Sequence, residues 1–121
     1  MATYTQTDLI KDALVEIGVQ DPEEAVPANR LAFAQRRLER LLEGLQDESL
    51  TDWDITSDVP KDRFTHMLQI LTGHLAPAYG VPMPIDPQSG RALEEERGRA
   101  AIREAVQGAY IAPDFDRSRD Y

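Results

Sequence analysis

The chain contains no cysteine, which excludes disulfide bonds, thiolate catalysis and zinc sites with cysteine ligands. It has no run of about 18 apolar residues, so the sequence predicts no membrane-spanning helix. Its first residues, MATYTQTD, hold neither a basic nor an apolar stretch, and we expect no secretory signal there. The GxSxG, HExxH and P-loop motifs are missing as well, which leaves the common hydrolase and nucleotide-binding classes without support.

Positive charge is in short supply, because 13 Lys and Arg residues face 22 Asp and Glu residues, for a net charge of −9. A protein that binds DNA without sequence preference needs a basic surface to neutralise phosphates, so this balance argues against that class. An acidic surface also serves solubility, and the charge alone identifies no partner. At 121 residues the chain is long enough for one domain that buries about two-thirds of its unfolded surface.

Candidates for chemistry are few. His66 and His74 are the only histidines, and on one helix their side chains point about 80° apart, two turns from each other. We therefore expect no metal site, and we interpret His74 as a half-buried core residue. Asp52 and Asp54 form a carboxylate pair of the kind used in acid–base chemistry, but no supporting His, Tyr or Asn pattern accompanies them. We expect no enzyme and no cofactor.

The strongest pattern present is a long helix from Pro27 to Gln46, whose proline suits the first helical position. At about 30 Å it is long enough to cross a small domain. Its apolar stripe covers an arc of roughly 100°: Leu31, Ala34, Leu38, Leu41, Leu42 and Leu45.

The side of this helix away from the leucines carries four residues at i, i+4, i+7 and i+11: Phe33, Arg37, Arg40 and Gly44. We interpret them as a contact face for a neighbouring subunit, on which the glycine lets another backbone come close. An ordinary solvated face with one exposed phenylalanine is the alternative, because single exposed apolar residues are common.

Further helices are predicted on either side of this central helix. The first covers about Asp8–Ile17, with Thr5 or Thr7 as N-cap and Gly18 as its left-handed C-terminal residue. An irregular crossing follows the central helix between 47 and 60. We expect Trp53 to plug the core from this loop, and a short extended piece is predicted around 53–56.

The next helix is predicted from Lys61 to Tyr79, with a kink near Pro77 because its ring would press on residue 73, which is glycine. Three prolines stiffen residues 81–87. Asp86 as N-cap and Pro87 at the first position then open a last helix that ends near Ala109. Its small-residue face around Gly98 predicts close packing on another helix, in this chain or in a neighbour.

These elements predict an all-α fold: a small bundle of about four helices with a long central helix, an irregular crossing loop and an extended C-terminal tail. Residues 1–111 form the helical domain. Residues 112–121 lack a helical period and are predicted to be a flexible docking arm.

The order of these segments resembles that of the adaptor proteins of tailed double-stranded DNA phages, also called head-completion, head–tail connector or tail accessory proteins. The likeness covers about nine-tenths of the chain. It rests on four segments and on the closing helix at 87–109: ALVEIGV at 13–19, RLAFAQRRLERLLEGLQDE at 30–48, DWDI at 52–55 and VPKDRFTHMLQILTGHLAPAYGV at 59–81.

The resemblance implies a structural virion protein of the head–tail neck, made in the cytoplasm of a bacterial host. About twelve copies would form a ring beneath the portal protein, extend the DNA channel and carry the tail or stopper proteins. DNA would pass through the lumen without specific binding, since an acidic wall shares its charge. The resemblance implies no catalytic residue, metal, cofactor or membrane contact.

In such a ring the C-terminal segment reaches up to the portal protein. The residues expected to dock there are Ile111, Phe115, Arg117, Arg119 and Tyr121. Two other classes stay open at this point. One is an acidic helical regulator that binds a basic partner or mimics DNA, and the other is an accessory enzyme that acts on peptidoglycan through carboxylates.

Overall fold

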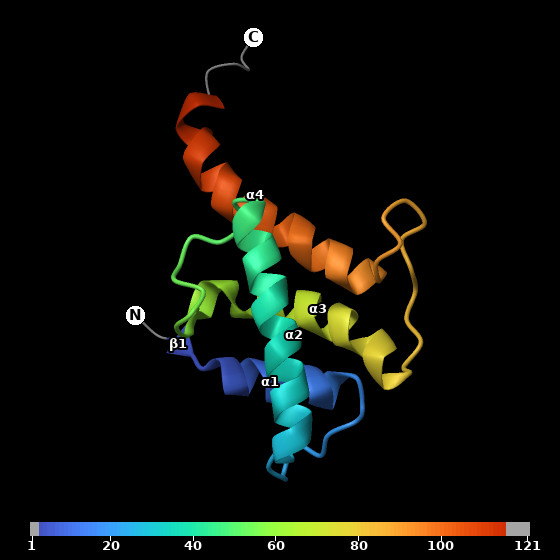
Figure 1. The fold of residues 1–121 in the computed structure, drawn as a ribbon. Coiled ribbons are helices and arrows are strands. Elements are labelled where there is room, and N and C mark those ends of the chain that lie inside the picture. Colours follow the sequence, from blue (N-terminus) through green and yellow to red (C-terminus); the bar gives the residue numbers. More distant parts are fainter. Residues whose placement is uncertain (1–2, 116–121) are drawn as a thin grey trace.

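The structure is a computed structural model that describes residues 3–115, with side chains described for residues 3–106. Its elements are β1 (Thr3–Tyr4), α1 (Gln6–Glu16), α2 (Ala28–Asp47), β2 (Val59–Pro60), α3 (Lys61–Leu75), the 3₁₀ helix η1 (Ala76–Tyr79) and α4 (Leu93–Phe115). Helix α3 lies between α1 and α4, and α2 crosses one face of this stack (Figure 1). The predicted all-α bundle with a long central helix is confirmed.

The two short strands tie the start of the chain to the start of α3. They pair antiparallel, with Thr3 opposite Pro60 and Tyr4 opposite Val59. The ring of Tyr4 also lies 4.5 Å from that of Phe64, centroid to centroid. Among the described helices, none combines the length and the apolar character that a bilayer crossing requires.

Helix α1 has caps that the sequence predicts, and it begins at Gln6, two residues before the predicted start. Thr5 is the N-cap: its side chain accepts a hydrogen bond from the backbone N–H of Asp8 at 3.0 Å, and the Asp8 carboxylate accepts one from Thr5 N–H at 3.3 Å. This reciprocal pair satisfies two backbone donors that the first turn leaves open. Gly18 has φ +83°, which a glycine adopts at no steric cost, and Val19 N–H donates to the Leu14 carbonyl at 3.1 Å.

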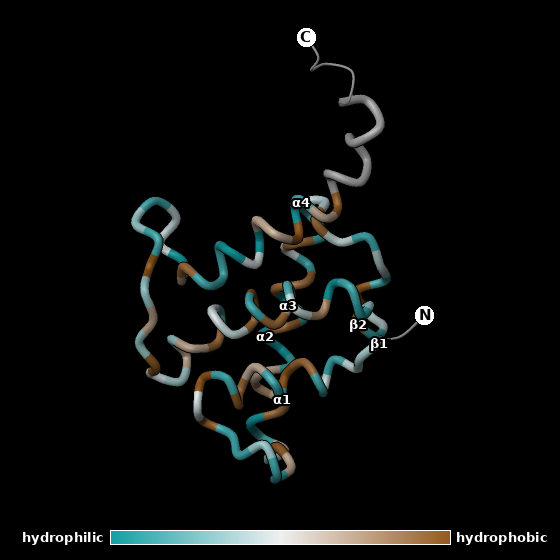
Figure 2. Tube along the Cα trace, turned by 180° about the vertical axis from the view of Figure 1, so that it is seen from behind, coloured by the Kyte–Doolittle hydropathy of each residue, from teal (hydrophilic) through white to brown (hydrophobic). Residues whose placement is uncertain are grey.

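One core joins α1, α2 and α3 with Ile102 of α4. Most of the predicted stripe of α2 is buried there, namely Ala34, Leu38, Leu41, Leu42 and Leu45. Seen from the opposite side, hydrophobic and hydrophilic residues alternate along the helices, as they do in amphipathic helices (Figure 2). Trp53 is partly buried against this core, which confirms its interpretation as a loop plug.

The extended piece predicted around 53–56 is wrong. Asp54 closes a turn there instead, because its carboxylate accepts hydrogen bonds from the backbone N–H of Thr56 at 2.9 Å and from its hydroxyl at 2.7 Å. An aspartate that bonds the backbone two residues on favours a turn over a strand. The extended segment lies later, at Val59–Pro60, where Tyr4 and Thr3 offer a partner.

The explanation of Gly73 as a residue that tolerates a kink at Pro77 is also wrong. Pro77 lies in the first turn of η1, after α3 has ended at Leu75, and Gly73 faces α4. A Cβ atom at Gly73 would lie 2.7 Å from the backbone nitrogen of Glu95. The glycine therefore permits the close crossing of α3 and α4. Gly98 serves the same crossing from α4, so its small-residue face packs within this chain.

Helix α4 differs from the prediction at both ends. Asp86 and Pro87 open a turn instead of the helix, since the Asp86 carboxylate accepts from Gln88 N–H at 2.9 Å and Gly90, with φ +79°, closes the turn. The helix begins only at Leu93, and it continues past Ala109 to Phe115. The first residues of the predicted docking arm are thus helical, while 116–121 lie outside the described residues.

Candidate interaction surface on helix α2

The structure places the four predicted contact residues of α2 on its outward side, which we call the outer face: Phe33, Arg37, Arg40 and Gly44. Arg40 is exposed and the other three are partly exposed. At Gly44 no atom lies within 4 Å of the place that a Cβ would take, so the surface is open at that point. The outer face is available for contact, but Phe33 and Arg37 also have partners within the chain.

Phe33 packs against a residue that the sequence did not indicate. Its ring meets Tyr79 of η1 edge to face, with centroids 5.8 Å apart and planes at 85°. The Arg37 guanidinium carbon lies 5.0 Å from the centre of the Phe33 ring, which is cation–π geometry. Burial raises the pKa of Tyr79, and the nearby charges of Arg30 and Arg37 act against that rise. These contacts fix Phe33 as a rigid part of the outer face.

Beside the outer face, α2, α3 and α4 enclose a surface hollow of about 300 Å³, which we call the basic hollow. Its lining residues are Arg37, Arg40, Leu41, Gly44, His74 and Arg99. Three arginines around one hollow stand out in a chain of net charge −9. The arrangement suits an anionic group and offers it an apolar floor at Leu41.

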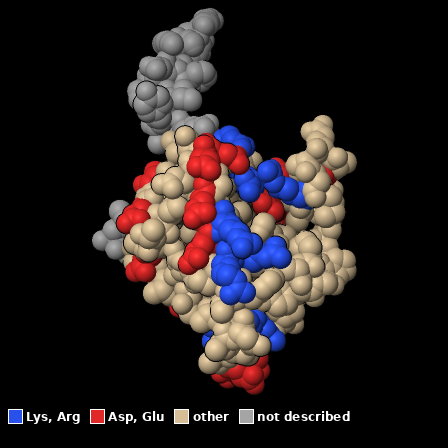
Figure 3. Space-filling view, viewed as in Figure 1, with Lys and Arg blue, Asp and Glu red and all other residues tan. Residues whose placement is uncertain are grey.

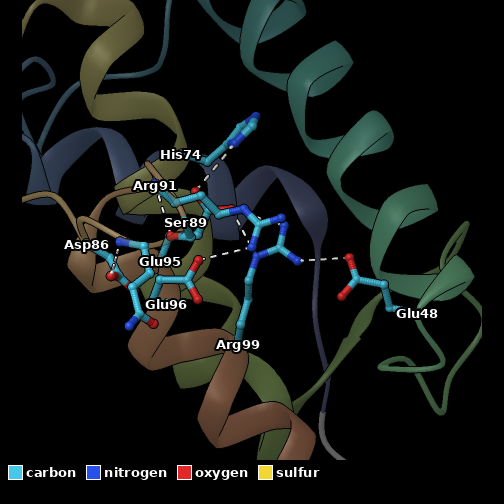
Figure 4. A network of polar contacts seen from close by, with 9 residues as sticks. Glu48, His74, Asp86, Ser89, Arg91, Glu95, Glu96 and Arg99 are labelled. Carbon is cyan, nitrogen blue, oxygen red and sulfur yellow. Dashed lines mark hydrogen bonds and ion pairs between the residues drawn. The ribbon is translucent and has the colours of Figure 1, made fainter.

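The wall of the basic hollow is a network of charged side chains (Figure 4). Arg99 donates from Nε to the Glu95 carboxylate at 3.1 Å and from Nη1 to the Glu48 carboxylate at 3.3 Å. His74 Nδ1 lies 3.8 Å from Glu95 Oε1, the distance of an ion pair when the histidine is protonated. The network joins the end of α2 to α3 and α4, so it holds the hollow in shape.

Glu95 is the most deeply placed acid of this network, with 5% of its side chain exposed. Burial alone would raise the pKa of its carboxyl, but His74 and Arg99 outweigh that effect, and the pKa lies below its ordinary value of 4.5. Glu95 is therefore charged at neutral pH, and it forms an ion pair with Arg99. That leaves Arg37 and Arg40 as the cations of the hollow that an incoming anion meets.

Sequence reasoning found only part of this surface. It placed Phe33, Arg37, Arg40 and Gly44 on one face, and the i, i+4 spacing of Glu95 and Arg99 on the last predicted helix also indicates that pair. It took His74 for a half-buried core residue, and the structure confirms the half burial but adds Glu95 as its partner. It did not find Glu48 or Tyr79, because their partners Arg99 and Phe33 lie far away in the sequence.

The carboxylates suggested for acid–base chemistry do not form a working pair. Asp52 forms an ion pair with Arg63, Oδ2 to Nη2 at 2.7 Å. Asp54 is occupied by Thr56, whose side-chain and backbone hydrogen bonds lower the pKa of its carboxyl. A general acid needs a raised pKa, which Asp54 lacks, and Asp52 is held by Arg63, so the pair gives no support to glycosidase-type chemistry.

No group of three or more metal-binding side chains occurs among the described residues. We predict that zinc leaves the melting temperature unchanged, because His66 and His74 diverge on α3 and His74 already faces Glu95. Thermal unfolding with an excess of zinc, and again with a chelator, measures this. A rise of several degrees at one equivalent of zinc would mean that the histidines bind it.

The five residues predicted to dock on the portal lie beyond the surface just described. Ile111 and Phe115 belong to the last turns of α4, in the part whose side chains are outside the described residues. Arg117, Arg119 and Tyr121 lie outside the described residues altogether. Their docking role stays a prediction.

Comparison with known proteins gives no match for this chain among protein-family models, curated proteins or solved structures. The fold and the surface themselves therefore define the class. This is a small, acidic, all-α domain whose long central helix presents an outer face beside a basic hollow.

Proposed function

We propose that this protein is a structural component of a tailed-phage virion: an adaptor whose copies form a ring beneath the portal protein. There it completes the head, joins it to the tail and extends the channel for DNA. The proposal starts from the resemblance in segment order and requires no catalytic residue. One structural observation supports it most, the outer face of α2 beside the basic hollow.

A ring subunit needs two different contact patches, since head-to-tail contacts pair unlike surfaces. The α2 outer face offers a rigid aromatic in Phe33, an exposed cation in Arg40 and an open backbone at Gly44. Aromatic and arginine side chains are the residues that contribute most often to protein interfaces. The long helix stands at the surface of the bundle, where two neighbours have access to it (Figure 1).

The net charge of −9 agrees with a role around DNA that avoids binding it. A channel wall of the same sign as the phosphates lets the duplex slide, whereas a basic wall would hold it. Of the three arginines of the basic hollow, Arg99 is paired with Glu48 and Glu95 within the chain.

The docking arm provides the test of this function. We predict that deletion of residues 112–121 leaves the melting temperature within a few degrees and abolishes binding to the portal protein. Pro113 and the charged residues that follow it offer little to bury until a partner supplies pockets. Single arms should bind weakly and a ring of arms strongly, because linked contacts add up in affinity. A pull-down with the portal protein of the genome that encodes this chain measures the loss.

The matched control is a full-length chain in which residues 112–121 are replaced by glycine and serine. It keeps the length and removes the side chains, so it should also fail to bind. Full portal binding by the deletion variant would refute the docking role. A large fall in its melting temperature would instead show that the segment stabilises its own domain.

A further inference from the structure

Two hollows of opposite charge flank α2. The basic hollow lies on the side of α3 and α4. A second hollow of about 210 Å³ lies on the other side, between α2, the start of α1 and the crossing loop, and we call it the acidic hollow. Its lining residues are Gln6, Glu39, Leu42, Glu43, Ile55 and Thr56. The space-filling view shows acidic side chains along one side of this helix and arginines along the other (Figure 3).

The exposed charges on α2 are grouped by sign on two sides of the helix. Glu39 and Glu43 are both exposed and stand four residues apart, as do Arg36 and Arg40. Like charges repel at that spacing, while the opposite charges of Arg36 and Glu39, and of Arg40 and Glu43, stand three residues apart, where they could support the helix. Within the described residues, none of these four side chains forms an ion pair in the chain. The pattern favours a partner outside the chain.

The two hollows also share an interface-like composition. Each has an apolar floor under a charged rim, with Leu41 beneath the arginines and Leu42 with Ile55 beneath the glutamates. An apolar centre with a polar rim is typical of protein interfaces. The open space at Gly44 adds room for a neighbouring helix at the basic hollow.

We infer that the two hollows are complementary, and that the acidic hollow of one copy contacts the basic hollow of the next. Glu39 and Glu43 of the first copy then face Arg37 and Arg40 of the second. Because the contact joins unlike patches, every copy keeps one patch for a further neighbour, and the assembly grows until it closes into a ring. The inference rests on the proposed function in that it needs many copies side by side.

The absence of cysteine makes the contact measurable by disulfide trapping. Gln46→Cys places a thiol beside Glu43 on the acidic side, and Gly44→Cys places one in the basic hollow. The two variants are mixed in equal amounts, oxidised mildly at low salt and separated by mass. We expect the mixed dimer to exceed either single-variant dimer by about tenfold, against about twofold for random pairing.

Salt and charge reversal identify the cause of the preference. About 1 M salt screens charges beyond roughly 3 Å and should return the ratio to about twofold. Arg40→Glu alone or Glu43→Arg alone, placed in both cysteine variants, should remove the preference for the mixed dimer. The two substitutions together exchange the charges and should restore that preference. Arg36→Glu is the matched control. It makes the same charge change as Arg40→Glu, but Arg36 lines neither hollow, so this variant should keep the preference.

A twofold ratio at low salt, or a charge exchange that fails to restore the preference, would overturn the inference. Equal loss from Arg36→Glu would overturn it too, because net charge would then be the cause. No portal protein enters this experiment, so its result is separate from that of the pull-down. Trapping without portal binding would reject the adaptor role and keep the contact, and the reverse would reject the contact alone.

Discussion

Replacement of Gly98 by alanine is expected to lower the melting temperature by about 10 °C. The added Cβ would lie 2.7 Å from Ile70 Cγ1 and 2.8 Å from the carbonyl oxygen of His66. A backbone atom cannot yield as a flexible side chain does, so α3 and α4 must separate. We expect a net loss of about 2–3 kcal/mol, even though alanine favours a helix over glycine by about 1 kcal/mol.

The matched control for this variant is Gly44→Ala on α2. Both glycines lie inside helices, but at Gly44 nothing stands within 4 Å of the new Cβ. Alanine should therefore stabilise the protein there by about 0.5–1 kcal/mol, through the loss of backbone freedom in the unfolded chain. Opposite signs for the two variants in thermal or urea unfolding are the expected result. Equal small effects would mean that the crossing of α3 and α4 is looser than described.

Removal of the Glu95 carboxylate is expected to cost about 3 kcal/mol at neutral pH, because Arg99 would be left largely buried with only Glu48 as partner. The loss should depend on pH. The pKa of Glu95 is lowered in the folded state, so its contribution is fully present above the ordinary value of 4.5. It disappears as pH falls through the lowered pKa. The free energies of unfolding of the wild type and of Glu95→Ala should therefore converge in acid.

Glu96→Ala is the control for that experiment. Glu96 is the next residue and forms its own ion pair with Arg91 at 3.0 Å, but both side chains are more exposed. A surface pair of this kind contributes about 0–1 kcal/mol, so we expect a small change at every pH. Urea unfolding of both variants from about pH 3 to pH 7 gives the comparison. Similar losses for the two variants would show that the Glu95 network does not stabilise the α3–α4 crossing.

The sequence predicts those parts of the fold whose cause is local. The leucine stripe of α2, the Thr5 cap and the left-handed Gly18 are set by residues within a few positions of each other. The errors occurred where a distant segment decides. Gly73 was explained by Pro77, four residues on, whereas the atom that needs its space is the backbone nitrogen of Glu95.

The start of α4 shows a second kind of limit. Asp86 followed by Pro87 is a good helix start, but the same pair also opens a turn, and Gly90 closes that turn. Local sequence cannot choose between a helix start and a turn at this pair. The turn is closed across the loop by the backbone hydrogen bond from Leu93 N–H to the Pro84 carbonyl. The predicted helix was therefore six residues too early at this end.

For the candidate surface, helical spacing placed Phe33, Arg37, Arg40 and Gly44 together correctly. It gave no sign of the basic hollow, since His74 and Arg99 reach that place from α3 and α4. Nor did it show that the charges of α2 are divided between two hollows, because the acidic one is completed by Gln6 and the crossing loop. A surface made by several elements appears only when they are assembled.

The central claim, an adaptor ring beneath the portal, is tested most directly by electron microscopy of the purified portal protein with and without this chain. The account predicts an added ring of density on one end of the portal, with one copy of this chain for each portal subunit and α2 at the contacts between copies. A portal that stays bare at high concentrations of the chain would contradict it, as would a chain that binds there only as separate single copies.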